Sequence, residues 1–486
     1  MNPPSSTSLL DALQPLRTLL GPQGFLDQAV DLEPYLVDHR RLYRGITPVV
    51  LRPESTEQAA QILKLCHAHR IGVVPVGGNT GYCGGATPSA AGNEVVVSLA
   101  RLKRIRHIDP FNYTLTVEAG CVLAEVQQAA AGVERLFPLS LGSEGSCQIG
   151  GNLSTNAGGT AVLRYGMARE LVLGLEVVLP DGRVLDDLTG LRKNNMGYDL
   201  RDLFMGAEGT LGIITAATLK LFPLPRTYAT ALVAVNDPQA AVTLLAHLRN
   251  GGSDSLTTFE LMPRTALELV FAHINGSHDP FDATHPWYVL LEATSAKVGE
   301  HLQDELAALL EEAQQQDLIR DALLAQSESQ REAFWRIRES IPEAQTRAGG
   351  SIKHDISVTI SELPRLIEEG MQLCKQLAPE GVLVVYGHLG DGSLHFNINT
   401  PPQLAGGSGR SEFLAKAGAI HRAMHELVAR YRGSISAEHG IGQLKREELA
   451  RYKDPVALAV MQSIKQALDP QGIMNPGKVL AVPVAG

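Results

Sequence analysis

The sequence lacks a long apolar run, paired cysteines and a basic cluster. No apolar run reaches the ~18 residues that a membrane helix needs, so we expect no transmembrane segment. The five cysteines form no CxxC pair, which argues against a disulfide framework or an Fe–S cluster and indicates a reducing compartment, the cytoplasm. The 42 Lys and Arg residues against 52 Asp and Glu give a net charge of −10, which argues against nucleic acid as a partner. The N-terminal residues also lack the pattern of a secretory signal.

Two common nucleotide-binding motifs are also missing. No GxGxxG occurs in the chain, which argues against NAD bound on a dinucleotide fold. A match to GxxxxGK occurs at Gly472–Lys478, but Val479 follows it where a P-loop needs Ser or Thr for Mg²⁺. The residues after it are also too few for the helix that must face the phosphates. We therefore expect no nucleoside triphosphate site there.

Helices and strands alternate along the first half of the chain. Residues 55–70 begin with a Ser cap and have helical apolar spacing, and they predict a helix. The β-rich runs 171–179 and 184–185 flank an Asp-Gly turn and predict a hairpin. The proline-spaced residues 222–228 predict a domain boundary, beyond which strands and long helices indicate a second α+β domain. The Gly- and Ser-rich residues 405–411 predict an exposed loop.

Glycine is concentrated in three segments that follow or open predicted strands, at 75–81, 141–159 and 206–213. Consecutive glycines leave backbone N–H groups free to converge on an anion. Tight turns between strands would explain a single segment of this kind. Three of them indicate one extended ligand that the chain contacts along its length.

Three histidines and two further polar residues mark a second kind of site. His388 and His395 lie in the segment GHLGDGSLHFN, and Asn397 projects from the same strand face as His395. Glu438 and His439 are adjacent in the segment SAEHG. Two imidazoles and a carboxylate suit Zn²⁺, Mn²⁺ or Fe²⁺ with an open coordination position. Because isolated histidines are also common on surfaces and in hydrogen-bonded cores, the pattern alone leaves metal binding open.

A competing histidine pair lies four residues apart on one helical face, at His421 and His425. Arg422 and Glu426 stand beside them, and these charged neighbours favour a solvated face over a metal site.

The motifs PVGGNTG at 75–81, GNLSTNAGG at 151–159 and AEGTLGIIT at 207–215 carry a resemblance. In order and density they resemble the flavin-binding half of the vanillyl-alcohol oxidase superfamily, and within it the branch of D-2-hydroxyglutarate and D-lactate dehydrogenases. The resemblance implies an α+β fold: a two-subdomain FAD-binding domain of the PCMH type, an α+β cap domain with an antiparallel sheet, and a C-terminal segment that returns to the flavin domain. It implies the FAD-binding domain at 41–226, the cap or substrate domain at 227–430 and the completing segment at 431–486. The resemblance begins at about residue 40, and before it the amphipathic pattern of residues 5–36 predicts one or two short helices, so we expect N-terminal helices at 1–40.

The resemblance also implies that FAD binds along the glycine segments, with its pyrophosphate on the first. Asn79 stands in that loop, so we expect FAD to be non-covalent, with Cys83 and Cys147 as the remaining alternatives for attachment. The residues expected to bind FAD are Val76, Gly77, Gly78, Asn79, Thr80, Gly81, Gly142, Ser143, Gly150, Gly151, Asn152, Thr155, Asn156, Gly158, Glu208, Gly209, Gly212, Ile213 and Asn475.

The same resemblance assigns roles to the polar residues of the second half. It implies that the metal, with zinc expected first and manganese or iron as alternatives, is held by His388, His395 and Glu438, and that His439 is the catalytic base. The segments around Arg338 and Lys353 match substrate segments of the family, and these cations and Asn397 would bind the substrate. Where D-2-hydroxyglutarate dehydrogenases are expected to have Thr, four residues after the arginine, this chain has Pro342. That departure leaves open how the distal carboxylate of the substrate is bound and which acid is preferred.

The implied activity is oxidation of a D-2-hydroxy acid to the 2-oxo acid by hydride transfer to flavin N5, with D-2-hydroxyglutarate expected first. D-Lactate dehydrogenase and the flavin subunit of a glycolate oxidase are alternatives of the same class. A non-enzymatic protein that binds metal and anions on this scaffold is an alternative of another class. The electron acceptor implied is electron-transfer flavoprotein or a quinone-linked chain, and the chain could form a homodimer.

Overall fold

The computed structural model describes residues 6–251, 253–299 and 301–481. Contacts along the chain divide it into two compact units. Unit 1 comprises residues 1–159, 166–224 and 438–486, and unit 2 comprises residues 160–165 and 225–437. No helix in the described part of the chain is long and apolar enough to cross a membrane.

Unit 1 contains a mixed four-stranded sheet in the order β1-β2-β4-β3. Its strands are β1 (Phe25–Leu26), β2 (Val50–Leu51), β4 (Glu94–Ser98) and β3 (Gly72–Val76), and β2 and β3 run parallel to β4. Helix α4 (Thr56–His69) connects β2 to β3 and begins at Ser55, whose side chain accepts a hydrogen bond from the Gln58 N–H. The predicted Ser cap and helix are confirmed.

The second sheet of unit 1 is antiparallel, in the order β5-β6-β10-β8-β9. Its strands are β5 (Ile105–Asp109), β6 (Thr114–Glu118), β10 (Ile213–Lys220), β8 (Val172–Val178) and β9 (Val184–Asp187). The turn between β8 and β9 places Gly182 at φ +86°, a conformation that favours glycine, and the predicted hairpin is confirmed.

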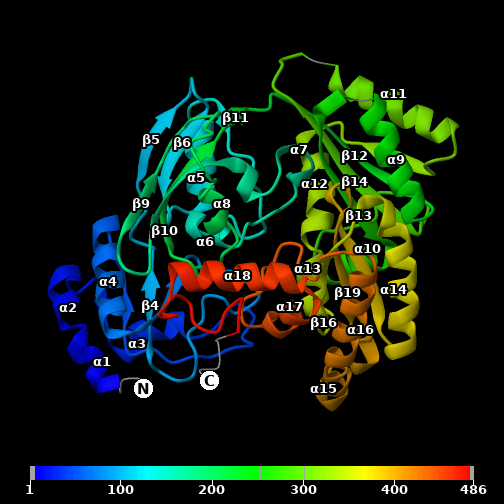
Figure 1. Cartoon of the computed structure of the whole chain (residues 1–486). Coiled ribbons are helices and arrows are strands. Elements are labelled where there is room, and N and C mark those ends of the chain that lie inside the picture. Colours follow the sequence, from blue (N-terminus) through cyan, green and yellow to red (C-terminus); the bar gives the residue numbers. More distant parts are fainter. Residues whose placement is uncertain (1–5, 252, 300, 482–486) are drawn as a thin grey trace. The chain divides into compact units, whose positions relative to one another are not determined.

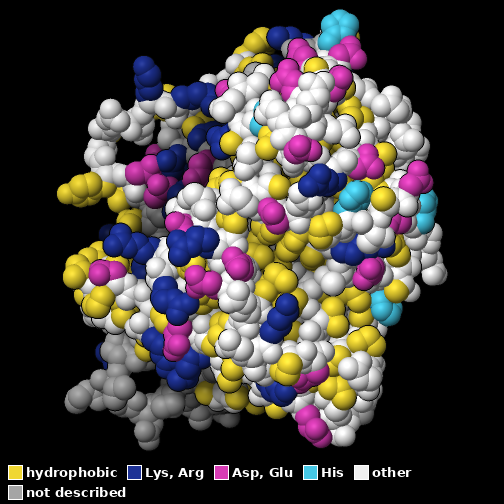
Figure 2. Space-filling view, turned by 90° about the vertical axis from the view of Figure 1, so that its right-hand side faces the viewer, with side chains coloured by type: hydrophobic (Ala, Val, Ile, Leu, Met, Phe, Trp, Pro, Cys, Tyr) yellow, Lys and Arg dark blue, Asp and Glu magenta, His cyan; other side chains and the backbone are white. Residues whose placement is uncertain are grey.

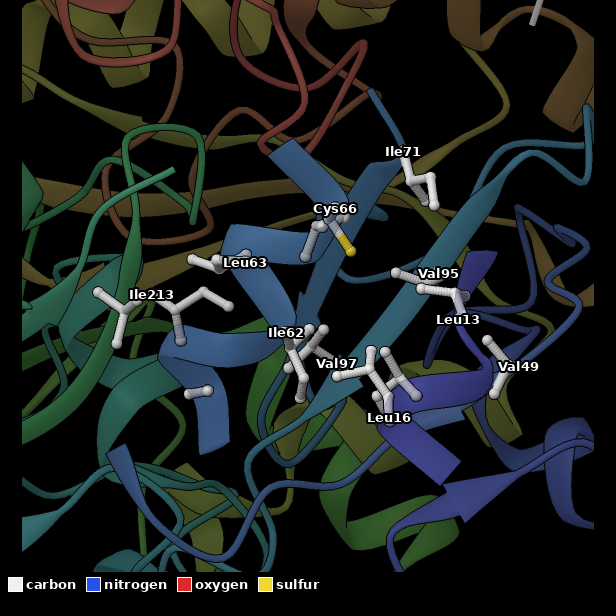
Figure 3. Close-up of a cluster of buried hydrophobic side chains, with 14 of the residues drawn as sticks. Leu13, Leu16, Val49, Ile62, Leu63, Cys66, Ile71, Val95, Val97 and Ile213 are labelled. Carbon is white, nitrogen blue, oxygen red and sulfur yellow. The ribbon is translucent and has the colours of Figure 1, made fainter. Parts of the chain in front are cut away.

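The core of unit 1 packs α4 and the N-terminal helices against the strands (Figure 3). α1 (Ser6–Ala12) and α2 (Gln14–Leu20) lie next to α4, which contributes Ile62, Leu63 and Cys66 from its buried face. Val95 and Val97 of β4 face the same cluster. The apolar spacing of α4, three or four residues apart, therefore fixes which side of the helix covers the sheet.

The C-terminal residues belong to unit 1. After α17 (Arg446–Tyr452) and α18 (Pro455–Leu468), the chain runs beside β3. The Val73 N–H donates to Ile473 O at 2.8 Å, and the Asn475 N–H donates to Val73 O at 2.8 Å. The predicted return of the C-terminal segment to the first domain is therefore confirmed. The other elements of unit 1 are α3 (Ala29–Leu32), α5 (Leu123–Ala131), β7 (Arg135–Leu136), α6 (Ile149–Ser154), α8 (Arg201–Phe204) and β11 (Phe222–Pro223).

Unit 2 is built on an eight-stranded antiparallel sheet in the order β15-β12-β14-β13-β18-β19-β16, with β17 also paired to β19. The strands are β12 (Thr227–Val235), β13 (Leu256–Pro263), β14 (Trp287–Ser295), β15 (Asp321–Leu324), β16 (Ser351–Ile352), β17 (Asp355–Ser357), β18 (Val382–His388) and β19 (Ser393–Asn399). Its antiparallel pairing agrees with the cap domain expected from the sequence.

Helices cover both faces of this sheet (Figure 1). α10 (Arg264–His273), α12 (Glu328–Glu339) and α13 (Ile341–Arg347) enclose one apolar core with alternate residues of the strands. α9 (Pro238–Gly251), α11 (Leu302–Gln315) and α14 (Leu363–Leu377) lie on the other face. α16 (Ala417–Arg430) packs on α14. On the face drawn in Figure 2, acidic and basic side chains are interspersed rather than separated.

Two segments of unit 2 differ from the sequence predictions. Residues 405–411 were expected to form a loop, but α15 (Gly407–Ala415) begins inside them, so this prediction was wrong. Residues 160–165, which include α7 (Val162–Tyr165), group with unit 2 although they lie within the 41–226 segment. Arg164 Nη1 donates to both Thr294 O and Thr294 Oγ1 at 2.7 Å, which ties this segment to β14.

Candidate active site

The three glycine segments adjoin one another in unit 1. The Glu208 N–H donates to Ser154 O at 2.8 Å, which joins the third segment to the second. A Cβ on Gly78 would lie 2.3 Å from Ser146 O, and a Cβ on Gly77 would lie 3.5 Å from Gly151 N. The first and second segments are therefore packed backbone against backbone, which only glycine permits at Gly78.

Other glycines of these segments face open space. A Cβ on Gly81, Gly142 or Gly151 would meet no other atom within 4 Å. Asn475, on the returning C-terminal segment, donates from Nδ2 to Gly85 O at 2.9 Å and to Glu208 O at 2.7 Å. Its Oδ1 is buried without a hydrogen-bond partner in the described structure. Space beside glycine backbone and an unsatisfied buried acceptor are what a bound polar ligand would use.

Glu208, expected among the cofactor-binding residues, has its carboxylate hydrogen-bonded to backbone. The N–H groups of Ile441 and Gly442 donate to its two oxygens, each at 2.7 Å. Burial of the carboxylate raises its pKa above the ordinary value, although the two backbone donors act in the opposite direction. Glu208 thus holds the segment that directly follows His439.

Glu438 and His439 come immediately before that segment, in unit 1. Glu438 Oε1 accepts a hydrogen bond from the Gly159 N–H at 2.8 Å. A Cβ on Gly158 would lie 2.9 Å from the same oxygen, so the end of the second glycine segment supports this carboxylate. The His439 ring meets the Tyr82 ring edge-on, with centroids 4.7 Å apart. Both predicted residues are only partly exposed.

In unit 2, the predicted histidine pair converges. His388 ends β18 and His395 lies within β19, and a tight turn joins the two strands. Their ring centroids are 5.8 Å apart, and ligand-capable atoms of the two side chains lie within 4.8 Å of each other. Asp355 on β17 stands directly opposite His395 and also offers an oxygen within 4.8 Å of it. Sequence reasoning missed Asp355, although it lies two residues after Lys353.

Asn397 is held in a buried network of side-chain amides. Its Nδ2 donates to Gln345 Oε1 at 3.0 Å, and its Oδ1 accepts from the His354 N–H at 3.3 Å. Gln345, fully buried on α13, donates in turn to Asn399 Oδ1 at 2.6 Å. The amide orientation of Asn397 is therefore fixed, with one of its two N–H bonds committed to Gln345.

Arg338, expected to bind substrate, contacts a buried carboxylate. Its Nε and Nη2 donate to Glu260 Oε2 at 2.8 and 2.7 Å. Glu260 Oε1 lies 2.6 Å from His388 Nδ1. Despite full burial, His388 and Arg338 lower the pKa of Glu260 to about 2. Sequence reasoning missed Glu260, which lies in an otherwise apolar stretch of β13.

The other two substrate positions lie near these residues in unit 2. Lys353 is half-buried in the short connection between β16 and β17. Pro342 is exposed in the first turn of α13, where a missing backbone N–H costs no helical hydrogen bond.

The histidine pair on α16 is not on a solvated face, so that prediction was wrong. His425 is 5% exposed, and His421 Nδ1 lies 2.9 Å from His354 Nε2. His354 Nδ1 lies 2.7 Å from Phe396 O, so its ring links α16 to β19. The charged neighbours Arg422 and Glu426 suggested solvent exposure. They are adjacent to the histidines in the sequence, but successive residues of a helix point in different directions, so they lie on another face.

The comparisons with known proteins identify the family of this chain. Residues 224–479 match the family model described as FAD linked oxidases, C-terminal domain, and residues 47–187 match the FAD binding domain. The chain belongs to the FAD-linked oxidase family. It is 37% identical to the mitochondrial D-2-hydroxyglutarate dehydrogenase of Arabidopsis thaliana, over 96% of this chain and 80% of that protein. It is also 37% identical to the D-2-hydroxyglutarate dehydrogenase of Stutzerimonas stutzeri (strain A1501), over 96% of this chain and 98% of that one.

The fold is shared more widely within this class. The structure of p-cresol methylhydroxylase with substrate bound superposes with a TM-score of 0.76, at 19% identity, over 98% of this chain and 97% of that one. The expected α+β fold of a PCMH-type flavin domain with a cap domain is confirmed. So is the resemblance to the branch of D-2-hydroxyglutarate dehydrogenases, and this FAD-linked oxidase is an oxidoreductase of that class. Because the Arabidopsis relative is named as mitochondrial, the cytoplasm remains only an expectation for this chain.

The residues of this FAD-linked oxidase fit its cofactor. Residues 47–187 contain the first two glycine segments, where Gly81, Gly142 and Gly151 leave space beside the backbone. The unsatisfied Asn475 Oδ1 and the backbone N–H groups of the first loop are polar groups that FAD could use. The donor set of His388, His395 and nearby carboxylates likewise fits a divalent cation of the zinc, manganese or iron kind.

Proposed function

We propose that this chain is an FAD- and divalent-metal-dependent dehydrogenase that oxidises a D-2-hydroxy acid, D-2-hydroxyglutarate first, to the 2-oxo acid. The observation that carries the proposal is the convergence of His388 and His395 beside buried carboxylates in a chain of the FAD-linked oxidase family. The names of relatives at 37–39% identity supply the substrate class.

The proposed metal ligands are His388, His395 and Glu438, with zinc as the first candidate. Glu438 directly follows Ala437, whose backbone N–H donates to Asp355 O at 3.3 Å on β17, the strand beside His395. Two imidazoles and one carboxylate leave coordination positions open for the carboxylate and hydroxyl of a 2-hydroxy acid. Asp355 offers an alternative oxygen ligand for the metal beside the His395 imidazole.

In the proposed reaction, His439 is the base that takes the proton of the C2 hydroxyl. An imidazole is the commonest general base in enzymes, and Glu208 holds the backbone that follows His439. Bound FAD supplies the hydride acceptor at N5, and a bound divalent cation supplies positive charge beside the hydroxyl oxygen. The substrate thereby loses a proton and a hydride and leaves as the 2-oxo acid.

Substrate recognition is assigned to Lys353 and Asn397. The ammonium of Lys353 suits a carboxylate, and the second N–H of the Asn397 amide can donate to substrate while the first is held by Gln345. Arg338 would support the site through Glu260, the carboxylate with which it pairs. Because Pro342 offers no hydroxyl, other groups must bind the distal end of the substrate. The main alternative is that the preferred substrate is a D-2-hydroxy acid with a side chain of different length.

A panel of hydroxy acids tests this function. Purified chain reconstituted with FAD and Zn²⁺ is assayed with an artificial dye acceptor on the D and L forms of 2-hydroxyglutarate, lactate and malate, and on glycolate. We expect turnover of D-2-hydroxyglutarate and none of its L form. No turnover of any D-2-hydroxy acid by the loaded protein would refute the proposal. The physiological acceptor, electron-transfer flavoprotein or a quinone-linked chain, stays a prediction.

A further inference from the structure

Glu260 is a buried carboxylate at the centre of the unit 2 sheet. It lies on β13, directly opposite His388 on the neighbouring strand β18, and its side chain is fully shielded from solvent. A carboxylate in such a place is stable only when both oxygens are paired. Because Glu260 lies directly opposite His388, the imidazole of that residue is within reach of one of its oxygens.

Each oxygen of Glu260 has its own partner. Oε1 lies 2.6 Å from His388 Nδ1, and Oε2 accepts from Nε and Nη2 of Arg338 at 2.8 and 2.7 Å. The guanidinium is a permanent donor, so Oε2 serves only as an acceptor. As the carboxylate partner of the Arg338 guanidinium, Glu260 has no proton to give, so its Oε1 accepts the Nδ1–H of His388, and the neutral imidazole then carries its lone pair on Nε2.

The same arginine contacts Tyr386, whose ring lies beside the second histidine. The guanidinium carbon of Arg338 lies 4.8 Å from the centre of the Tyr386 ring, and that ring lies 5.0 Å from the His395 ring. One buried network thus supports both imidazoles, from β13, β18, β19 and α12.

We propose that Glu260 is the positioning residue that fixes the tautomer and ring orientation of His388 for a divalent cation, and that Arg338 acts through Glu260 rather than as a direct grip on the substrate. The inference rests on the proposed function for its metal. A carboxylate that accepts the second N–H of a metal-bound histidine orients the ring, and its loss weakens metal binding about 10–100-fold.

The neighbouring strand offers a matched control. Glu292 on β14 is also buried, and it accepts from Arg331 Nε and Nη2 at 2.7 and 3.0 Å. Arg331 lies on α12, as Arg338 does, and Trp335 Nε1 donates to the same carboxylate at 3.0 Å. A Glu292→Gln change therefore perturbs a similar buried pair of the same helix and sheet without touching a histidine.

The experiment measures Zn²⁺ affinity of the full chain by competition with a chromophoric chelator, with FAD content and melting temperature recorded for each variant. We expect Glu260→Gln to bind Zn²⁺ about 10–100-fold more weakly while it retains FAD, and Glu292→Gln to bind as wild type does. Equal Zn²⁺ affinity of Glu260→Gln and wild type would overturn the inference, and so would an equal loss in Glu292→Gln. A wild type that bound no Zn²⁺ would instead refute the metal of the proposed function.

Two further variants distinguish a positioning role from a loss of folding and from direct contact with the substrate. If Glu260→Gln does not fold, Glu260→Asp keeps the charge but shortens the reach, and it should also weaken Zn²⁺ binding; unchanged affinity would overturn the inference. In Arg338→Lys, we expect any rise in KM to be reversed by saturating Zn²⁺. A KM that stays raised at saturating Zn²⁺, with Zn²⁺ affinity unchanged, would make Arg338 a direct substrate ligand.

Discussion

Asn397 Nδ2 donates to Gln345 Oε1 at 3.0 Å, and Gln345 is fully buried. The orientation of the proposed substrate-binding amide therefore depends on a residue that lies outside every motif of the sequence. We predict that Gln345→Met, which removes the acceptor at similar volume, raises KM about two- to tenfold, the effect of one lost hydrogen bond. Steady-state kinetics test this. FAD and Zn²⁺ content should stay unchanged, and Gln372→Met on the exposed face of α14 is the control.

The proposed base gives the second prediction. His439→Ala should lower the rate of flavin reduction by at least about a hundredfold, because the hydroxyl proton then has no acceptor at that position. The protein should remain yellow, because the substitution leaves every residue of the three glycine segments unchanged. Stopped-flow reduction measures the effect, and His69→Ala, on the exposed end of α4, is the matched control. Undiminished reduction would remove His439 from the mechanism.

Two glycines of the first loop should respond differently to Ala. A Cβ on Gly78 would overlap Ser146 O at 2.3 Å, so Gly78→Ala should lower both the melting temperature of the apoprotein and FAD binding. Gly81 faces open space, so Gly81→Ala should leave apoprotein stability near that of wild type and weaken FAD alone. Thermal melts with and without FAD, and flavin titrations, distinguish the two. Unchanged FAD affinity in Gly81→Ala would show that this space is not used by the cofactor.

The burial of the cysteines predicts that the flavin is bound non-covalently. All five are buried free thiols; Cys83 Sγ lies 3.3 Å from Gly440 O, and Cys147 Sγ accepts from Asn152 Nδ2 at 3.5 Å. Burial raises the pKa of Cys66 and Cys374 to about 12, so these thiols stay protonated and unreactive. We expect acid precipitation to release all of the flavin, and a thiol reagent to titrate the cysteines only after unfolding. Flavin that stayed with the precipitate would indicate a covalent bond.

Local signals predicted local structure well. The Ser55 cap, the Asp-Gly hairpin around Gly182 and the strand–turn–strand that joins His388 to His395 each depend on residues close in sequence. The glycine segments and histidine motifs also identified the family. These features carry their physical cause within a few residues, through caps, turn conformations and strand alternation.

The partners of the site residues could not be predicted in this way. Glu260, Arg338 and His388 meet only because β13 and β18 are neighbours in the folded sheet and Arg338 reaches Glu260 from helix α12. The sequence around Glu260 gives no signal of the partner of this glutamate. The charged residues next to His425 on α16 suggested a solvated position, although the histidine is buried. Long-range pairing decides such roles, and one sequence without its fold does not reveal it.

The most direct test of the proposed function is the anaerobic visible spectrum of the flavin when D-2-hydroxyglutarate is added. We predict that FAD-loaded protein reloaded with Zn²⁺ bleaches, that the same protein after chelation does not, and that the L form leaves both unchanged. Rapid bleaching after complete metal removal, or no bleaching of the loaded protein by any D-2-hydroxy acid, would contradict it.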